Sequence, residues 1–143
     1  MRLRRTAAFV TLAAVAMLLA AGCGASQSAA PSLDGTSWRL TEWTLSSLDP
    51  NDFTITAQFA GGKISGKSAV NSYGGPYTEG PGDAFAVGEL VSTMMAGPEP
   101  DMRAEKAYLS LLSAARSFKL DGGRLTLFDQ NGNEATIFAA EKP

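Results

Sequence analysis

Histidine is absent from this chain, and cysteine occurs once, as Cys23. Without imidazole the chain lacks the commonest general base and metal ligand of enzymes. A single cysteine cannot form an internal disulfide, and the G-x-S-x-G and S-x-x-K patterns of serine hydrolases are also missing. Carboxylates, lysines and tyrosines remain, but no pair of them is marked out for catalysis. We therefore predict no enzyme activity, no cofactor and no metal site.

A large basic block is missing as well. Arg2, Arg4 and Arg5 lie at the N-terminus, and without them the chain is more acidic than its formal net charge of −2. Nucleic acids and anionic lipid head groups are poor partners for an acidic surface. We predict no nucleic-acid partner and no nucleotide ligand.

The N-terminus has the layout of a secretory signal. A basic start precedes the apolar residues 6–21, which are fewer than the roughly 20 that a retained transmembrane helix needs. The letters LAAGC, which end at Cys23, resemble a bacterial lipobox, although Ala20 stands where leucine is usual. We predict a signal peptide over residues 1–22 and lipidation of Cys23.

A lipidated Cys23 would anchor the mature chain to a cell-envelope membrane on its extracytoplasmic side, because two or more acyl chains hold a protein stably. Residues 23–32 are mostly small and would form a flexible tether. Residues 33–141 have the size of one domain. We expect a monomer whose partner is the membrane, through this lipid.

Residues Gly61–Ser68, GGKISGKS, match the phosphate-binding loop pattern G-x-x-x-x-G-K-[ST]. The pattern requires a helix from Lys67 onward, but the glycines and prolines of residues 74–82 disfavour one. A two-residue glycine turn instead pairs Phe59 with Ile64 and places the large apolar residues on one face. We interpret this stretch as a β-hairpin rather than a nucleotide site.

Strand-like patterns occur on both sides of this hairpin. They cover residues 36–45, 53–59, 84–91, 117–120, 124–128 and 135–138. A helix is predicted over about residues 99–116, since acidic residues open it and Met102, Tyr108, Leu109 and Leu112 recur at helical spacing. The predicted fold class is α+β, an antiparallel β-sheet curled into an open barrel with one α-helix packed against it.

The sequence allows two registers for the last hairpin. A three-residue loop pairs Leu127 with Ile137, whereas a two-residue loop pairs Leu127 with Thr136. We favour the first register because it sets two large apolar side chains opposite each other.

Four segments follow one another in an order that is typical of one protein family. They are GTSWRLTEW, QFAGGKISGKSAVNSYGGPY, STMMAGPEPDMRAEKAYLSLL and LTLFDQNGNEATIF. With them the chain resembles, from about residue 33 to residue 140, the META domain family, which includes HslJ-like envelope lipoproteins. The resemblance implies an antiparallel β structure with one helix. Val70 and Gly97 stand where the family often has cysteines, so the resemblance also implies a disulfide that this chain lacks.

Six residues match positions of the family, and we take them as possible ligand, partner or structural residues: Asn71, Tyr73, Tyr77, Met95, Met102 and Glu105. Their residue types also allow structural roles. The asparagine suits a turn or a backbone contact, the tyrosines suit strand packing, and the methionines suit the junction of sheet and helix. For Glu105 the candidate partners are a buried backbone group, Arg103 or Arg124.

The resemblance implies no defined reaction, and members of the family are often linked to envelope stress. Our first hypothesis is a non-enzymatic envelope module that binds an envelope protein or a cell-wall partner. The second is a carrier or chaperone that holds a lipid or other apolar ligand inside the barrel. A hydrolase that uses Glu105, or Ser65 with Lys67, is the least favoured, because solvated lysines are protonated at neutral pH and cannot accept a proton.

Overall fold

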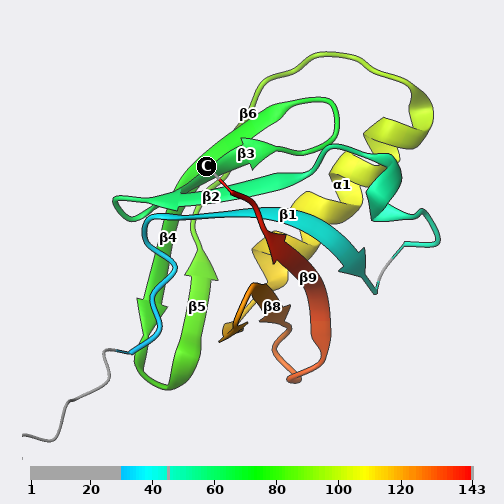
Figure 1. Cartoon of the computed structure of the whole chain (residues 1–143). Coiled ribbons are helices and arrows are strands. Elements are labelled where there is room, and N and C mark those ends of the chain that lie inside the picture. Colours follow the sequence, from blue (N-terminus) through cyan, green and yellow to red (C-terminus); the bar gives the residue numbers. More distant parts are fainter. Residues whose placement is uncertain (1–29, 45, 143) are drawn as a thin grey trace, which may run out of the picture.

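The computed structural model describes residues 30–44 and 46–142. Figure 1 shows strands curled into a barrel, with one α-helix packed against it. The strands are β1 (Thr36–Trp43), β2 (Thr56–Ala60), β3 (Lys63–Lys67), β4 (Ser72–Gly80), β5 (Ala84–Val87), β6 (Val91–Ser92), β7 (Ser117–Asp121), β8 (Arg124–Phe128) and β9 (Glu134–Ala140). The helix α1 spans Glu99–Ala114, and short 3-10 helices occur at Pro50–Asp52 and Pro81–Asp83.

The predicted signal peptide, Cys23 and most of the tether lie outside the described residues. Within the part of the chain that the structure describes, no helix is both long enough and apolar enough to cross a membrane.

The barrel forms because β3 and β4 join the two ends of one antiparallel sheet. The strand order is β3-β2-β1-β9-β8-β7-β5-β4, and β4 pairs again with β3, for example through Tyr73 and Gly66. Strand β6 adds to the first half of β4, where Ser92 faces Tyr73. The junction of β5 with β7 is narrow, with one residue pair, Ala84 and Ser117. The predicted α+β barrel with one packed helix is confirmed.

The β2–β3 hairpin shows what the GGKISGKS segment is. Gly61 and Gly62 form its two-residue turn with φ of 59° and 74°, and Phe59 faces Ile64 as predicted. Lys67 is an exposed strand residue, and another strand follows it rather than a helix. The segment therefore lacks the strand–loop–helix geometry that a phosphate-binding loop requires.

The favoured register of the β8–β9 hairpin is wrong. Leu127 faces Thr136 rather than Ile137. The pairing shifts between Leu127 and Phe128, and Phe128 faces Glu134. This β-bulge takes up one extra residue of β9 near the turn, so the length of the loop alone could not predict the register.

The helix ends earlier than predicted and presents a different face to the barrel. It stops at Ala114 rather than near residue 116, because Ala115 is extended, with φ of −61° and ψ of 141°, and leads into β7. Met102 and Leu109, predicted for the apolar stripe, are only half-buried. The buried side chains of the helix are Ala104, Glu105, Tyr108, Leu111 and Leu112.

Aromatic side chains fill much of the barrel interior. Phe59 and Tyr77 meet edge-to-face with ring centroids 4.9 Å apart, and Tyr108 of α1 lies 6.3 Å from Phe138 of β9. Each fully buried side chain of this size contributes about 1.5–3 kcal/mol through the apolar area it removes from water. The helix therefore adds to the barrel core by inserting Tyr108 into it.

Candidate functional site

Four of the six candidate residues meet where α1 lies against the β3–β4 turn and the segment that follows β6. Asn71, Met95, Met102 and Glu105 all line one open pocket of about 330 Å³. They come from three separate parts of the chain, so tertiary packing assembles this site.

Glu105 is a buried carboxylate, 7% exposed, and hydrogen bonds hold it. Its Oε2 accepts the backbone N–H of Asn71 at 2.7 Å, and its Oε1 accepts the Asn71 side-chain amide at 2.8 Å. The Ser68 hydroxyl lies 2.8 Å from Oε2 and 3.0 Å from the Asn71 carbonyl, and its single proton serves one of them at a time. We call Ser68, Asn71 and Glu105 the clamp.

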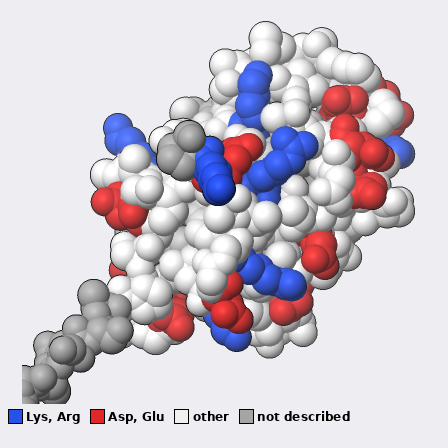
Figure 2. Space-filling model, viewed as in Figure 1, with Lys and Arg blue, Asp and Glu red and all other residues white. Residues whose placement is uncertain are grey.

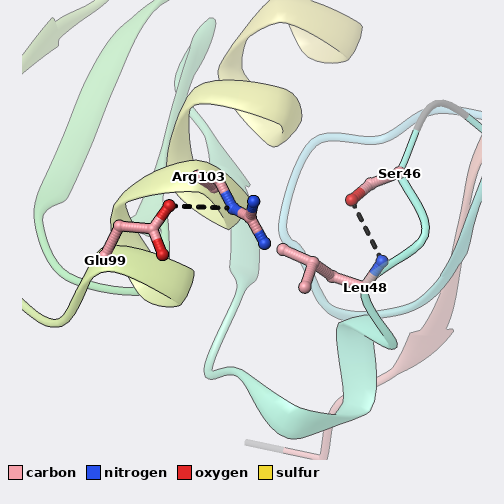
Figure 3. Close-up of polar contacts among 4 residues, drawn as sticks. All are labelled: Ser46, Leu48, Glu99 and Arg103. Atoms are coloured by element: carbon pink, nitrogen blue, oxygen red, sulfur yellow. Dashed lines mark hydrogen bonds and ion pairs between the residues drawn. The ribbon is translucent and has the colours of Figure 1, made fainter.

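The clamp contains no basic side chain. Arg103, one of the predicted partners of Glu105, instead forms an ion pair with Glu99 at 3.3 Å on the exposed side of α1 (Figure 3). Arg124, the other, lies opposite Asp121 in the β7–β8 hairpin. Of the three alternatives for Glu105, the structure shows the buried backbone group.

Hydrogen bonding decides the charge of Glu105. Burial by itself raises the pKa of this carboxyl group, but the bonds from Asn71 and Ser68 outweigh burial and leave its pKa below the ordinary value. At neutral pH the clamp therefore holds a buried negative charge. A carboxylate of low pKa whose two oxygens already accept hydrogen bonds is poorly suited to act as a general acid or base.

The Asn71 side chain ties the segment after β6 to the clamp. Its Oδ1 accepts the Met95 N–H at 2.7 Å and the Thr93 hydroxyl at 2.8 Å. Its Nδ2 donates to the Met95 carbonyl at 3.2 Å as well as to Glu105. Met95 thus makes both of its backbone hydrogen bonds to one amide, much as it would to a neighbouring strand.

Ser68 and Thr93 were missed in the sequence. Ser68 had a usable signal, because the alternation that points Ile64 into the barrel also points Ser68 inward, and a buried hydroxyl needs a partner. Thr93 had none, since its contact with Asn71 joins distant parts of the chain.

The tyrosines lie on the barrel side of the clamp. The Tyr73 hydroxyl donates to the Thr56 carbonyl at 2.9 Å and lies 2.6 Å from the Tyr108 hydroxyl. Burial raises the pKa of both phenols well above the ordinary value. Tyr77 lies further along β4, where burial and then the charge of Glu79 raise its pKa to about 12. These hydroxyls stay protonated at neutral pH, and those of Tyr73 and Tyr108 bond to each other inside the domain.

Large apolar side chains are exposed next to the clamp. Met94 is 97% exposed, Val91 68% and Met95 53%. Together with Met102 we call these residues the methionine surface. The 330 Å³ pocket shares Met102 and Glu105 with a neighbouring groove of about 550 Å³ along α1.

The META domain family model matches residues 31–142, which include nearly all of the described chain. The chain belongs to the META domain family. The resemblance noted in the sequence is thereby confirmed.

Solved structures show the same fold. An NMR structure of a protein from Burkholderia xenovorans is 26% identical to this META domain protein, with a TM-score of 0.65 over 82% of this chain and 96% of that one. A crystal structure of a DUF4847 family protein from Bacteroides vulgatus ATCC 8482 has a TM-score of 0.56 at 11% identity, over 78% and 96% of the two chains. A further NMR structure has a TM-score of 0.57 at 16% identity, over 75% and 90%. Among curated protein sequences, none matches this chain.

The two positions that often hold cysteine in META domains are neighbours here. A Cβ atom added to Gly97 would lie 3.4 Å from the Cβ of Val70. The Cβ atoms of a disulfide are about 3.5–4.5 Å apart. In this META domain the Val70 side chain fills the space next to Gly97, where the second cysteine would project.

Proposed function

We propose that this META domain is a non-enzymatic, lipid-anchored module of the cell envelope that binds an extended segment of a partner protein along β6 and the methionine surface. The observation that carries the proposal is the exposure of Val91, Met94 and Met95 on and beside an edge strand. Exposed groups of large apolar residues commonly mark protein-interaction sites, and methionine adapts to varied partners.

Strand β6 offers a free edge for such a segment. The sheet order ends at β6, so among the described strands it pairs with β4 alone. The Thr93 N–H donates to the Ser72 carbonyl of β4 at 3.0 Å. Because backbone groups alternate along an antiparallel strand, the N–H and C=O of Ser92 point away from β4. An extended peptide can add to this edge by backbone hydrogen bonds.

The proposed surface is remote from the predicted anchor. The Leu33 N–H bonds to Glu79 near the far end of β4, whereas β6 pairs with Tyr73 and Gly74 near its start. At about 3.3 Å per residue these points are roughly 15–20 Å apart. The first described residues and β6 accordingly lie at opposite ends of the view in Figure 1. A domain tethered at its N-terminal end would hold the methionine surface away from the membrane, where other envelope proteins can reach it.

The side chains that could take part in catalysis support a non-enzymatic role. Glu105 is ionised and fully engaged, and Tyr73 and Tyr108 bond to each other. Ser65 and Lys67, the other hydrolase pair considered, lie exposed on β3. Acidic and basic side chains are interspersed on the face shown in Figure 2, which suits a protein partner better than a nucleic acid.

The second hypothesis, an apolar ligand inside the barrel, receives less support. Ile55, Phe59, Ile64, Leu125 and Leu127 are fully buried and occupy the interior. A ligand there would have to displace packed side chains, which costs more than filling an existing cavity. Native mass spectrometry of the protein from its own host should therefore show no co-purifying lipid.

The lipid anchor and a role in envelope stress complete the proposal. Both rest on the sequence, through the lipobox-like segment at Cys23 and the link of the family to stress. We expect radiolabelled fatty acid to enter the wild-type protein but not Cys23→Ser, and the variant to leave the membrane fraction. Equal labelling of the two proteins would contradict the anchor.

The partner surface can be tested by photo-crosslinking in living cells, with the crosslinking residue at position 91 or 94. We expect the same protein to be captured at both positions, through a segment that mass spectrometry maps to one extended peptide. A crosslinker at position 119, which is exposed on β7, is the control and should not capture it.

Two variants show whether the edge itself is used. Ser92→Pro removes an N–H that faces solvent, and Val91→Asp places a charge on the apolar edge. Each should abolish the crosslink at position 94 while circular dichroism confirms the fold. Capture that persists in both folded variants, or that is as strong at position 119, contradicts the proposal.

A further inference from the structure

All three methionines of the described chain line one pocket. Met94 and Met95 come from the segment after β6, and Met102 comes from the first turns of α1. The ionised carboxylate of Glu105 lines the same pocket. We propose that this pocket binds a single soft monovalent metal ion, Cu(I), through the thioether sulfurs of Met94, Met95 and Met102.

The clamp brings the sulfur-bearing segments together. The Asn71 amide bonds to both backbone groups of Met95 and also to Glu105 of α1. Met102 lies one helical turn before Glu105, on the same side of the helix. The backbones that carry Met95 and Met102 are therefore held in place before any ion arrives, which lowers the entropic cost of binding.

Core packing does not account for these side chains. Met94 and Met95 are largely exposed, and Met102 is half-buried, whereas the large aliphatic and aromatic side chains of the barrel are buried. An exposed thioether is free to turn toward a bound ion, so the pocket needs no rearrangement of the core.

The charge of the site suits a cation. Glu105 is negative, and the clamp supplies no basic side chain to neutralise it. Both of its oxygens accept hydrogen bonds, so it acts through its field rather than as a ligand. Arg103 is engaged by Glu99. Lys106 also lines the neighbouring groove, and its positive charge opposes binding there.

Ligand type selects the metal. Neutral thioethers are soft donors that favour Cu(I) and bind the harder ions Zn²⁺, Mg²⁺ and Ca²⁺ weakly. Histidine and cysteine, the ligands on whose scarcity the prediction of no metal site was based, are absent from residues 30–143, whereas thioethers are present. Binding involves no redox step, since the ion enters and leaves as Cu(I).

The test uses Ag(I), which has the same charge and softness and does not change oxidation state. The full chain carries Cys23→Ser, so that its thiol cannot bind silver, and the methionine methyl groups are labelled with ¹³C. We expect the signals of Met94, Met95 and Met102 to shift together and to saturate at one equivalent.

Conservative variants identify the ligands. Met102→Leu keeps the volume of the side chain but removes the sulfur, and should weaken Ag(I) binding at least about tenfold, because loss of even an indirect contact costs metal sites 10- to 100-fold. Val91→Leu is the matched control and should bind as the wild type does. Competition with a Cu(I) chelator under reducing, anaerobic conditions should give the same ranking.

Three results would overturn the proposal: a shift of one methyl group alone, saturation well above one equivalent, or unchanged affinity in Met102→Leu. The outcome is separate from that for partner binding. Val91→Asp should keep the metal while it loses the crosslink, because Val91 does not line the pocket. Met102→Leu should lose the metal but keep the crosslink, because leucine preserves the apolar volume offered to a partner.

Discussion

Inside the barrel, Phe59, Ile64 and Leu125 are each fully buried among many apolar neighbours. At the clamp, a single carboxylate accepts the backbone N–H and the side-chain amide of Asn71 and lies within hydrogen-bond distance of Ser68. The core is redundant, because each contact is weak and the loss of a methyl group leaves a small cavity. The clamp is not redundant, because the loss of Glu105 leaves the backbone N–H and one side-chain N–H of Asn71 without an acceptor. The two regions should therefore respond differently to substitution.

The largest effect is expected from Glu105→Ala. Removing this carboxylate should lower the free energy of unfolding by about 3–5 kcal/mol, as when one member of a buried polar network is lost. Urea denaturation followed by circular dichroism measures it. Glu99→Ala on the exposed side of the same helix is the control and should cost less than about 1 kcal/mol. Similar losses in the two variants would remove the distinction between clamp and surface.

A disulfide should stabilise the region next to the clamp. Val70→Cys with Gly97→Cys, in a Cys23→Ser background, should raise the free energy of unfolding by about 2–4 kcal/mol when oxidised, because it restricts the unfolded chain. The reduced protein is the control, and mass spectrometry shows whether the bond has formed. If the oxidised form is no more stable than the reduced form, the two positions are not placed as the structure shows.

Acid should weaken the clamp before it weakens the core. The pKa of Glu105 is lowered in the folded state, so the unfolded chain binds more protons in mild acid. The contribution of Glu105 is complete above its unfolded pKa, about 4.3, and is lost as the pH falls through the lower folded value. The stability lost on acidification should be smaller than the stability lost in Glu105→Ala, because protonation leaves the side chain in place.

The measurement is the free energy of unfolding against pH for the wild type and for Glu105→Gln, which cannot titrate. The slope below about pH 4.3 should be shallower in the variant. Parallel curves for the two proteins would show that other carboxyl groups carry the acid sensitivity.

The smallest effect is expected inside the barrel. Ile64→Val removes one buried methylene group and should cost about 0.5–1.5 kcal/mol. Its stability curve should run parallel to that of the wild type at all pH values, because no titrating group is touched. A cost as large as that of Glu105→Ala would mean that the core is as intolerant as the clamp.

Alternation and helical spacing in the sequence predicted which segments are strands and which is the helix. They predicted the helix end and one strand register less well. The Gly61-Gly62 turn and the pairing of Phe59 with Ile64 follow from alternation over a few residues. The β8–β9 register could not be predicted from alternation, because a bulge next to Leu127 changes the residue count near the turn. The helix was predicted to continue to residue 116, but pairing of the following segment with β8 ends it at Ala114.

By itself the sequence determined the α+β class, the hairpins and the single helix, because alternation, glycine turns and helical spacing act between neighbours in the chain. It also marked Asn71 and Glu105, through the META resemblance, as positions to examine. Only the tertiary structure decided that these two side chains bond to each other, that Thr93 and Met95 attach to them, and that three methionines share one pocket. Such contacts join residues far apart in the chain, and their geometry exists only once the barrel has closed and the helix has packed.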